Sequence, residues 1–157
     1  MFVTLFSSSS SFFTLLCRFG STDGLYHYND TWLFELSTRK WTELQCTGYI
    51  PYPHEGHAIA LVNDVMYVFG GHGIDGYDLS DLIAFELSSK QIGMLKMHAL
   101  FVHMRHLAQQ WYMFQNMGPS PSRRLGHAMA SHGTQIFVVG GESSGSLEKD
   151  PCTRSVE

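Results

Sequence analysis

Residues 65–72 read Val-Met-Tyr-Val-Phe-Gly-Gly-His, and this stretch decides the fold. Five apolar residues, rich in β-branched and aromatic types, run directly into two glycines. Such a run, ended by a turn signal, predicts a buried β-strand. Gly70 and Gly71 carry no Cβ, so their backbone can adopt a positive φ or pass close to a neighbouring segment. The stretch therefore predicts a strand that ends in a tight, closely packed turn.

The same sequence pattern recurs along the chain. Residues 136–141 read Ile-Phe-Val-Val-Gly-Gly, and residues 18–21 read Arg-Phe-Gly-Ser, with serine at the second glycine position. The first glycines of the three copies are Gly20, Gly70 and Gly140, separated by 50 and then by 70 residues. A self-similar period of roughly 20–50 residues is the signature of a repeat architecture.

Other residues repeat together with the glycines. Residues 29–37, Asn-Asp-Thr-Trp-Leu-Phe-Glu-Leu-Ser, align with residues 80–88, Ser-Asp-Leu-Ile-Ala-Phe-Glu-Leu-Ser. A tryptophan and then Gly-His-Ala follow in both copies. The repeated structural positions are Gly70, Gly71, Gly140, Gly141, Asp30, Asp81, Trp41, Trp111, Gly56, His57, Gly126 and His127. One unit therefore contains four short strands separated by turns.

The second copy contains an insertion. From the phenylalanine of Phe-Glu-Leu to the tryptophan is 7 residues in the first copy and 26 in the second, so 19 residues are added at about 92–110. The insert is rich in Met, His and Leu, and Met97, Phe101 and Met104 have the spacing of an amphipathic helix. It is either a translated intron or a genuine loop whose helix binds a partner. We favour the intron because removing 19 residues restores the repeat period.

The order of these elements resembles the kelch repeat. A strand ending in Gly-Gly, an Asp-bearing strand, a tryptophan and Gly-His-Ala recur across residues 19–145. The resemblance implies an all-β fold, an incomplete kelch β-propeller in which each repeat makes one four-stranded blade. We expect one full four-stranded blade plus two partial blades, with an insertion that could be helical. Residues 118–126, rich in Pro and Arg, are most similar to fungal kelch proteins of the cell end and of cell polarity.

The repeats also divide the chain. We expect a partial kelch repeat at 19–53, a repeat with the insertion at 54–122, and a partial repeat at 123–145. Residues 146–157 form a tail. Residues 1–18 form a non-repeat N-terminal segment without the basic start and cleavage site of a signal peptide. Its two apolar pieces fall short of the ~20 residues that span a bilayer, so a non-native start is the favoured explanation.

Composition excludes several classes of function. The formal net charge is −4 with 10 Lys and Arg, so no basic surface for nucleic acid is expected. Cys17, Cys46 and Cys152 are far apart and odd in number, which argues against a secreted disulfide framework. We therefore expect a cytoplasmic protein with no nucleic-acid partner and no membrane association.

The sequence indicates no catalytic, cofactor-binding or metal-binding residue. His98, His103 and His106 in the insert have no carboxylate or cysteine nearby to complete a tetrahedral site. Residues 46–54 contain the cysteine, tyrosines and histidine that some kelch-type copper radical oxidases use. The family resemblance implies, however, that such a centre draws on several blades of a closed ring. We expect no enzyme, no cofactor and no metal, and keep a fragment of such an oxidase as an alternative.

The remaining hypothesis is a binding surface made by loops. In propellers the loops carry recognition while the blades position them. Loops at 22–29, 47–56, 72–79 and 118–125 contain Tyr and Arg, which are enriched in interface hot spots. The candidate partner-binding residues are Tyr26, Tyr28, Tyr49, Tyr52, His72, Tyr77, Arg123 and Arg124.

The expected function follows from the repeats and these loops. We expect a protein–protein interaction module of a kelch scaffold or adaptor, connected to cell polarity or the cytoskeleton. A ubiquitin-ligase substrate adaptor is a second alternative. One full and two partial blades leave blade faces and strand edges uncovered, so we also expect self-association of this chain.

Overall fold

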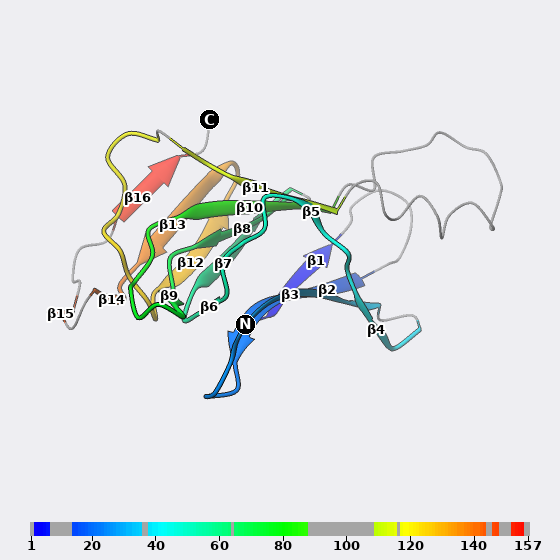
Figure 1. The fold of residues 1–157 in the computed structure, drawn as a ribbon. Helices are drawn as coiled ribbons and strands as arrows, with labels where there is room; N and C mark the ends of the chain where they lie inside the picture. Colours follow the sequence, from blue (N-terminus) through cyan, green and yellow to red (C-terminus); the bar gives the residue numbers. More distant parts are fainter. Residues whose placement is uncertain are drawn as a thin grey trace.

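The computed structural model describes residues 2–6, 14–35, 38–63, 65–87, 109–115, 117–143, 146–147 and 152–155. These residues form strands, turns and loops, and none of them lies in a helix. Most strands belong to three sheets that pack one after another (Figure 1). The described sheets do not close into a ring. The expected fold class, an all-β incomplete propeller, is therefore confirmed.

The first sheet has four antiparallel strands in the order β1-β2-β3-β4. They are β1 (Phe2–Phe6), β2 (Thr14–Thr22), β3 (His27–Glu35) and β4 (Lys40–Glu43). The repeat alignment leaves residues 1–18 outside the repeats. In the structure, Phe2–Phe6 nevertheless pair with Thr14–Arg18 as strands of the first sheet. Phe2 pairs with Arg18, so the backbone of this segment completes the first sheet as a four-stranded blade.

The second sheet repeats this arrangement and adds one short strand. Its order is β5 (Thr47–Gly48), β11 (Gln109–Met113), β10 (Leu82–Leu87), β8 (Val65–Phe69) and β7 (Ala58–Val62). β7, β8, β10 and β11 are antiparallel, whereas β5 joins β11 in parallel from the segment that links the first two sheets. Phe85 lies opposite Trp111, as Phe34 lies opposite Trp41. The pairing register thus agrees with the repeat alignment.

The insertion falls at the tip of a hairpin. Glu86 pairs with Gln110, as Glu35 pairs with Lys40 in the first sheet. The strand that carries Trp111 begins at Gln109, inside the range of about 92–110 that the repeat alignment assigns to the insert. Residues 88–108 lie outside the described part of the chain. The expectation of a helix in the insert therefore concerns residues that the structure does not describe. The pairing on both sides of the insert is therefore that of an uninterrupted repeat.

The third sheet consists of β12 (Ala128–His132), β13 (Gln135–Val139) and β16 (Cys152–Ser155). β16 comes from the segment expected to be a tail. Two small ribbons complete the described strands: β6 (His54–Glu55) with β9 (His72–Gly73), and β14 (Glu142–Ser143) with β15 (Ser146–Leu147). The division of the chain into repeats remains a prediction.

The second sheet is buried on both faces. Leu33 and Leu44 from the first sheet pack against one face, which contributes Ile59, Met66, Val68, Ile83, Phe85 and Trp111. On the other face, Ala60 and Val62 pack against Ile136 of the third sheet. Burial on both faces explains why β8 is apolar at successive positions and not only at alternate ones.

The outer faces of the stack are less covered. Trp111 is 1% exposed, but the equivalent Trp41 is 44% exposed. Phe69 is 3% exposed, but the equivalent Val139 is 53% exposed. Their equivalence to buried residues of the second sheet predicts that Trp41 and Val139 are buried, and for this chain that prediction is wrong. The physical reason is that no described sheet covers the outer face of the first or the third sheet.

Deleting residues 91–109 gives the same sequence as deleting 92–110, because residues 91 and 110 are both Gln, and should leave the fold intact. The deletion restores a connection of the same length as that between Glu35 and Lys40, and a shorter loop costs less entropy to close. We expect an unfolding free energy that is unchanged or up to about 1.5 kcal/mol higher, measured by urea denaturation. The matched control replaces the same 19 residues with a glycine-serine linker. A large loss of stability in both variants would show that the insert packs on the blade. Transcripts that all retain the 19 codons would contradict the intron interpretation.

Candidate functional site

The predicted binding loops lie at one end of the strands. In the second sheet, Ala58, Phe69 and Leu82 form a row at this end, and Val65 lies at the other end, opposite Glu86. The connection from β8 to β10 and the loops that enter β7 and β12 therefore share one side of the propeller. We call this side the loop face and define it by residues 23–28, 49–56, 71–79 and 118–126.

Contacts join the four loops into one surface. His27 Nε2 lies 3.5 Å from a carboxylate oxygen of Glu55, and Asn29 Nδ2 donates to the Pro51 carbonyl at 3.0 Å. These contacts tie the first loop to the second. Pairing of β6 with β9 ties the second loop to the third. The Gly71 amide donates to the Arg124 carbonyl at 2.8 Å and ties the third loop to the fourth.

Exposed tyrosines are the main feature of the loop face. Tyr26, Tyr28, Tyr52 and Tyr77 are all exposed. The structure adds three exposed aliphatic residues that the sequence analysis missed: Leu25, which is 84% exposed, Ile50 and Ile74. Their position beside the loop tyrosines was the available signal, but an aliphatic side chain ordinarily indicates core. The loop face thus presents more apolar surface than the tyrosines alone.

The first loop is held by its own hydrogen bonds. One Asp23 carboxylate oxygen accepts the amides of Leu25 and Tyr26, and the other accepts the Tyr28 hydroxyl at 2.8 Å. The hydrogen bonds from the Tyr26 and Leu25 amides lower the pKa of Asp23. Hydrogen bonding to this carboxylate raises the pKa of Tyr28. The exposed side chains of this loop are therefore presented on an ordered turn.

His72 closes the third loop. Its Nδ1 lies 2.8 Å from a carboxylate oxygen of Asp78, and the Asp78 side chain is buried. Within the same loop the Gly73 amide donates to the Tyr77 carbonyl. Tyr77 is exposed at the tip. His72 is thus oriented by Asp78, and part of its surface remains accessible beside Tyr77.

Arg124 differs from the other predicted binding residues because it is buried. It is only 3% exposed, and its guanidinium donates to the Gly140 carbonyl at 2.8 Å and to the carbonyl and hydroxyl of Ser122. Its own carbonyl accepts the Gly71 amide. Arg124 therefore connects the turns of the second and third sheets and is not presented to a partner. Its neighbour Arg123 is exposed.

The repeated glycines and histidines pack against one another. His57 and His127 are buried. A Cβ at Gly70 would lie 2.9 Å from His127 Cε1, and a Cβ at Gly71 would lie 3.1 Å from His57 Cβ. Both glycines have positive φ, +64° and +105°. These positions accept only glycine without a shift of the neighbouring backbone or ring.

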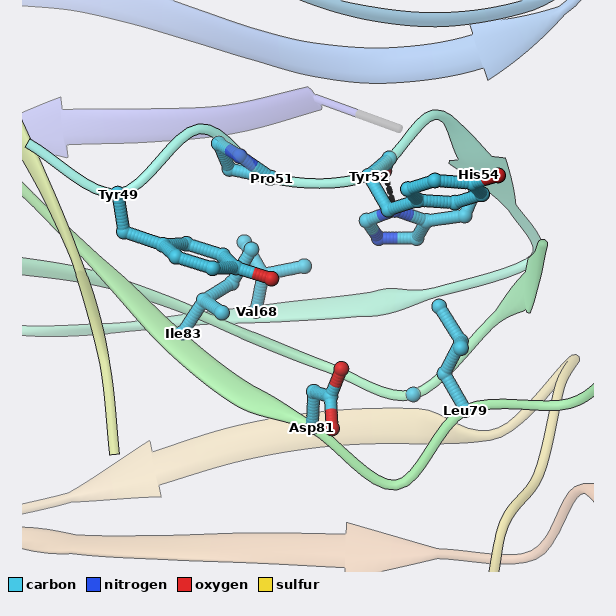
Figure 2. Close-up of a pocket in the computed structure, with 9 residues that line it drawn as sticks. Tyr49, Pro51, Tyr52, His54, Val68, Leu79, Asp81 and Ile83 are labelled. Atoms are coloured by element: carbon cyan, nitrogen blue, oxygen red, sulfur yellow. Dashed lines mark hydrogen bonds between the residues drawn. The ribbon is translucent and has the colours of Figure 1, made fainter. Parts of the chain in front are cut away.

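A small cavity lies beneath the second loop. Figure 2 shows Tyr49, Pro51, Tyr52 and His54 on one side of it and Val68, Leu79, Asp81 and Ile83 on the other. The enclosed volume of about 10 Å³ holds about one water molecule, which is too small for a substrate or an organic cofactor.

Burial favours the neutral forms of Tyr49 and His54 beside this cavity. Burial, followed by the charge of Asp81, raises the pKa of Tyr49. Burial lowers the pKa of His54, whose Nδ1 donates to the Tyr52 carbonyl at 2.5 Å. The cavity is therefore a small gap in the packing between the loop and the sheet.

The described residues contain neither a cluster of metal ligands nor a membrane-spanning helix. No three His, Cys, Asp or Glu side chains among the described residues lie close enough together to hold a metal ion. The three histidines of the insert fall outside these residues. No helix in the described segments is long and apolar enough to cross a membrane.

Comparison with known proteins identifies the repeats. A family model described as the KLHDC2/KLHL20/DRC7 Kelch-repeats domain matches residues 8–141. Tip elongation aberrant protein 1 of Schizosaccharomyces pombe is 33% identical over 113 residues, covering 72% of this chain and 8% of that protein. Kelch domain-containing protein 10 of Xenopus tropicalis is 30% identical over 138 residues, covering 83% of this chain and 28% of that protein.

A budding-yeast relative gives a similar result. Kelch repeat-containing protein 2 of Saccharomyces cerevisiae is 27% identical over 127 residues, covering 78% of this chain and 13% of that protein. The chain thus spans less than a third of the length of these curated relatives. The match to a fungal tip protein confirms the resemblance stated from the sequence.

The buried histidine between the sheets should make stability depend on pH. Burial lowers the pKa of His127 from 6.5 to about 4. Between these values the unfolded chain binds a proton that the folded chain does not, so the unfolding free energy falls as the pH drops from 6.5 to 4. We expect His127 to account for a loss of roughly 1–3 kcal/mol. Urea denaturation across this range measures it, and His127→Asn should have a shallower pH dependence. Equal dependence in both proteins would contradict the assignment.

Arg124 and Arg123 form a matched pair for testing structural and surface roles. Arg124→Ala removes three donated hydrogen bonds and should lower the unfolding free energy by roughly 2–4 kcal/mol. Arg123→Ala changes an exposed side chain and should stay within about 0.5 kcal/mol of the unmodified chain. Chemical denaturation of the two variants gives the comparison. Similar stability of both would show that the buried guanidinium does not hold the sheets together.

Proposed function

Because the chain belongs to the kelch-repeat family, we propose that it is a protein–protein interaction module and that its loop face binds the partner. The stacked sheets provide a rigid support, and the connections between their strands carry variable side chains. The module would serve within a larger scaffold or adaptor, since the chain spans a small part of its relatives.

Apolar side chains at the tips of ordered loops carry this proposal. Tyr26, Tyr52 and Tyr77 are exposed, together with Leu25 and Ile74. Tyrosine is enriched at interface hot spots because a large apolar ring ends in a hydroxyl that can form a hydrogen bond. Hydrogen bonds of Asp23 order the first loop before any partner arrives, which reduces the entropy lost on binding.

Binding explains the loop face better than catalysis does. The cavity beside it holds about one water molecule. The copper radical oxidase alternative would require a reactive cysteine in residues 46–54. Burial instead raises the pKa of the Cys46 thiol, which makes it less reactive toward forming the cysteine–tyrosine link of such a centre. A ubiquitin-ligase adaptor would use the same loop face for its substrate, and would also need a region that recruits the ligase.

We also propose a class of partner, on the basis of the names of two relatives. One relative is named for tip elongation in fission yeast, and another, from Bos taurus, is a Rab9 effector protein with kelch motifs. These names favour a cytoplasmic partner from the machinery of cell polarity, the cytoskeleton or membrane traffic. The relative of the tip elongation class supports cell polarity as the first candidate to test.

The proposal is tested by capturing proteins from an extract of the source organism on the immobilised chain. Tyr26→Ala combined with Tyr77→Ala should reduce the recovery of a specifically captured protein by about tenfold or more, which corresponds to about 1.4 kcal/mol. The melting temperature should not change, because both side chains are exposed. Tyr112→Ala is the matched control: Tyr112 is also exposed, but it lies on strand β11 away from the loop face. Equal recovery with the double variant, or equal loss with the control, would contradict the proposal.

A further inference from the structure

We infer that the cavity beneath the second loop binds the ammonium group of a lysine side chain on the partner protein. The inference rests on the proposed function, because it names a chemical group that the loop face would recognise. The residues that line the cavity come from the connection between the first two sheets, from strands β8 and β10 and from the turn that joins these strands (Figure 2). All of them are described, so the site is formed within the described part of the chain.

A carboxylate at the edge of the cavity supplies the negative charge. Asp81 is exposed, and one of its carboxylate oxygens points into the space that the Tyr49 hydroxyl also faces (Figure 2). Among the described residues, none donates a hydrogen bond to this carboxylate, whereas the Asp81 backbone carbonyl accepts the Gly70 amide. None of the residues that line the cavity is a lysine or an arginine. The Asp81 carboxylate is thus available to a cation from outside the chain.

The equivalent carboxylate of the first sheet is already engaged. In the repeat alignment Asp30 is equivalent to Asp81, and Trp32 is equivalent to Ile83. The Trp32 indole N–H donates to the Asp30 carboxylate. The Ile83 side chain has no donor. The second sheet therefore keeps the repeated carboxylate but lacks the indole that binds it, and this difference leaves a place for a donor from a partner.

The other residues that line the cavity suit a lysine side chain. Tyr52 is 50% exposed and Tyr49 is partly buried, and the face of a tyrosine ring attracts a cation. Burial, followed by the charge of Asp81, raises the pKa of Tyr49, so the tyrosine stays neutral beside the carboxylate. Val68 and Ile83 offer apolar surface, against which the methylene groups of a lysine can pack while its charged end reaches the carboxylate.

The size of the cavity favours an ammonium over a guanidinium group. The enclosed volume of about 10 Å³ holds about one water molecule. An ammonium group is a compact point charge on a flexible stem, whereas the guanidinium of arginine is planar and presents its donors in a rigid fork. We therefore expect the site to prefer lysine to arginine.

The experiment titrates the unmodified chain with n-butylammonium, which has the structure of a lysine side chain, and follows the ring signals of Tyr49 and Tyr52 by NMR. n-Butanol has the same stem without the charge, and n-propylguanidinium is the arginine equivalent. All titrations are made at one ionic strength. Butylammonium should shift both ring signals in a saturable way, and butanol and propylguanidinium should shift them several times less.

Two aspartate variants form a matched pair for this titration. Asp81→Asn keeps the shape of the side chain and removes its charge, so it should weaken butylammonium binding about tenfold. Asp30→Asn makes the same change at the equivalent carboxylate and should leave the binding unchanged. Tyr49→Leu removes one ring and should weaken the binding about threefold. The exposure of Asp81 makes its substitution compatible with folding, which the amide spectrum of the variant checks.

Other outcomes of the titration overturn the inference. The absence of a saturable shift would show that no ammonium binds, and equal shifts with butanol would indicate an apolar gap only. Equal binding by the two aspartate variants would show that Asp81 is not the recognising group. The titration needs no partner, so its failure would refute the lysine site and leave the capture of a partner through Tyr26 and Tyr77 as proposed.

The capture experiment then tests whether the ammonium belongs to the partner. Asp81→Asn should lower the recovery of the captured protein about fivefold or more, and Asp30→Asn should not. Acetylation of the lysines of the captured protein should remove this difference between Asp81→Asn and the unmodified chain, because acetylation removes the charge. Unchanged recovery with Asp81→Asn would contradict a lysine of the partner as the ligand, even if butylammonium binds.

Discussion

The packing of one buried imidazole against two glycine turns is the constraint on which the rest of the structure depends. The ring of His127 lies against Gly70 of the preceding sheet, and its Cβ would lie 2.9 Å from a Cβ at Gly141 of its own sheet. The edge of the Phe69 ring completes the contact, with centroids 5.5 Å apart at 77°. A larger residue at Gly70 would force the second and third sheets apart, and a larger residue at Gly141 would displace His127 within the third sheet. The Gly-Gly and Gly-His motifs, distant in sequence, are therefore one steric unit that sets the spacing of the blades.

Each loop that enters a new sheet is also anchored just before its histidine. Arg124 Nε donates to the carbonyl of Ser122, two residues earlier, and His54 Nδ1 makes the same contact with Tyr52. Both side chains are buried. An arginine and a histidine thus make the same hydrogen bond at equivalent turns. Because these anchors hold the turns, the amino acids at the loop tips can vary. This arrangement is what a recognition module needs, because stability depends on the anchors and specificity depends on the tips.

The repeat alignment predicted much of the fold because equivalent residues occupy equivalent positions. The strand register and the closely packed turn at Gly70 and Gly71 both follow from it. The exposure of Trp41 could not be predicted in the same way, since it depends on whether a neighbouring sheet is present. The burial of Arg124 could not be predicted either, because an arginine in a loop is ordinarily exposed. Its guanidinium is buried here because it donates to the Gly140 carbonyl of the third sheet.

The two ends of the strands carry different constraints, and this difference explains where the chain tolerates additional residues. At the loop face, two of the four connections, 49–56 and 118–126, pass from sheet to sheet, contain the anchors and lead directly into the buried His57 and His127. At the other end, the connections join strands of one sheet and need only a tight turn, such as those at Arg39 and Asn63, where φ is +55° and +53°. The 19-residue insertion lies at this second end, and the Glu86–Gln110 pair keeps the register across it. An addition there lengthens one loop, whereas an addition at the anchors of a connection between sheets would disturb the contact between two blades.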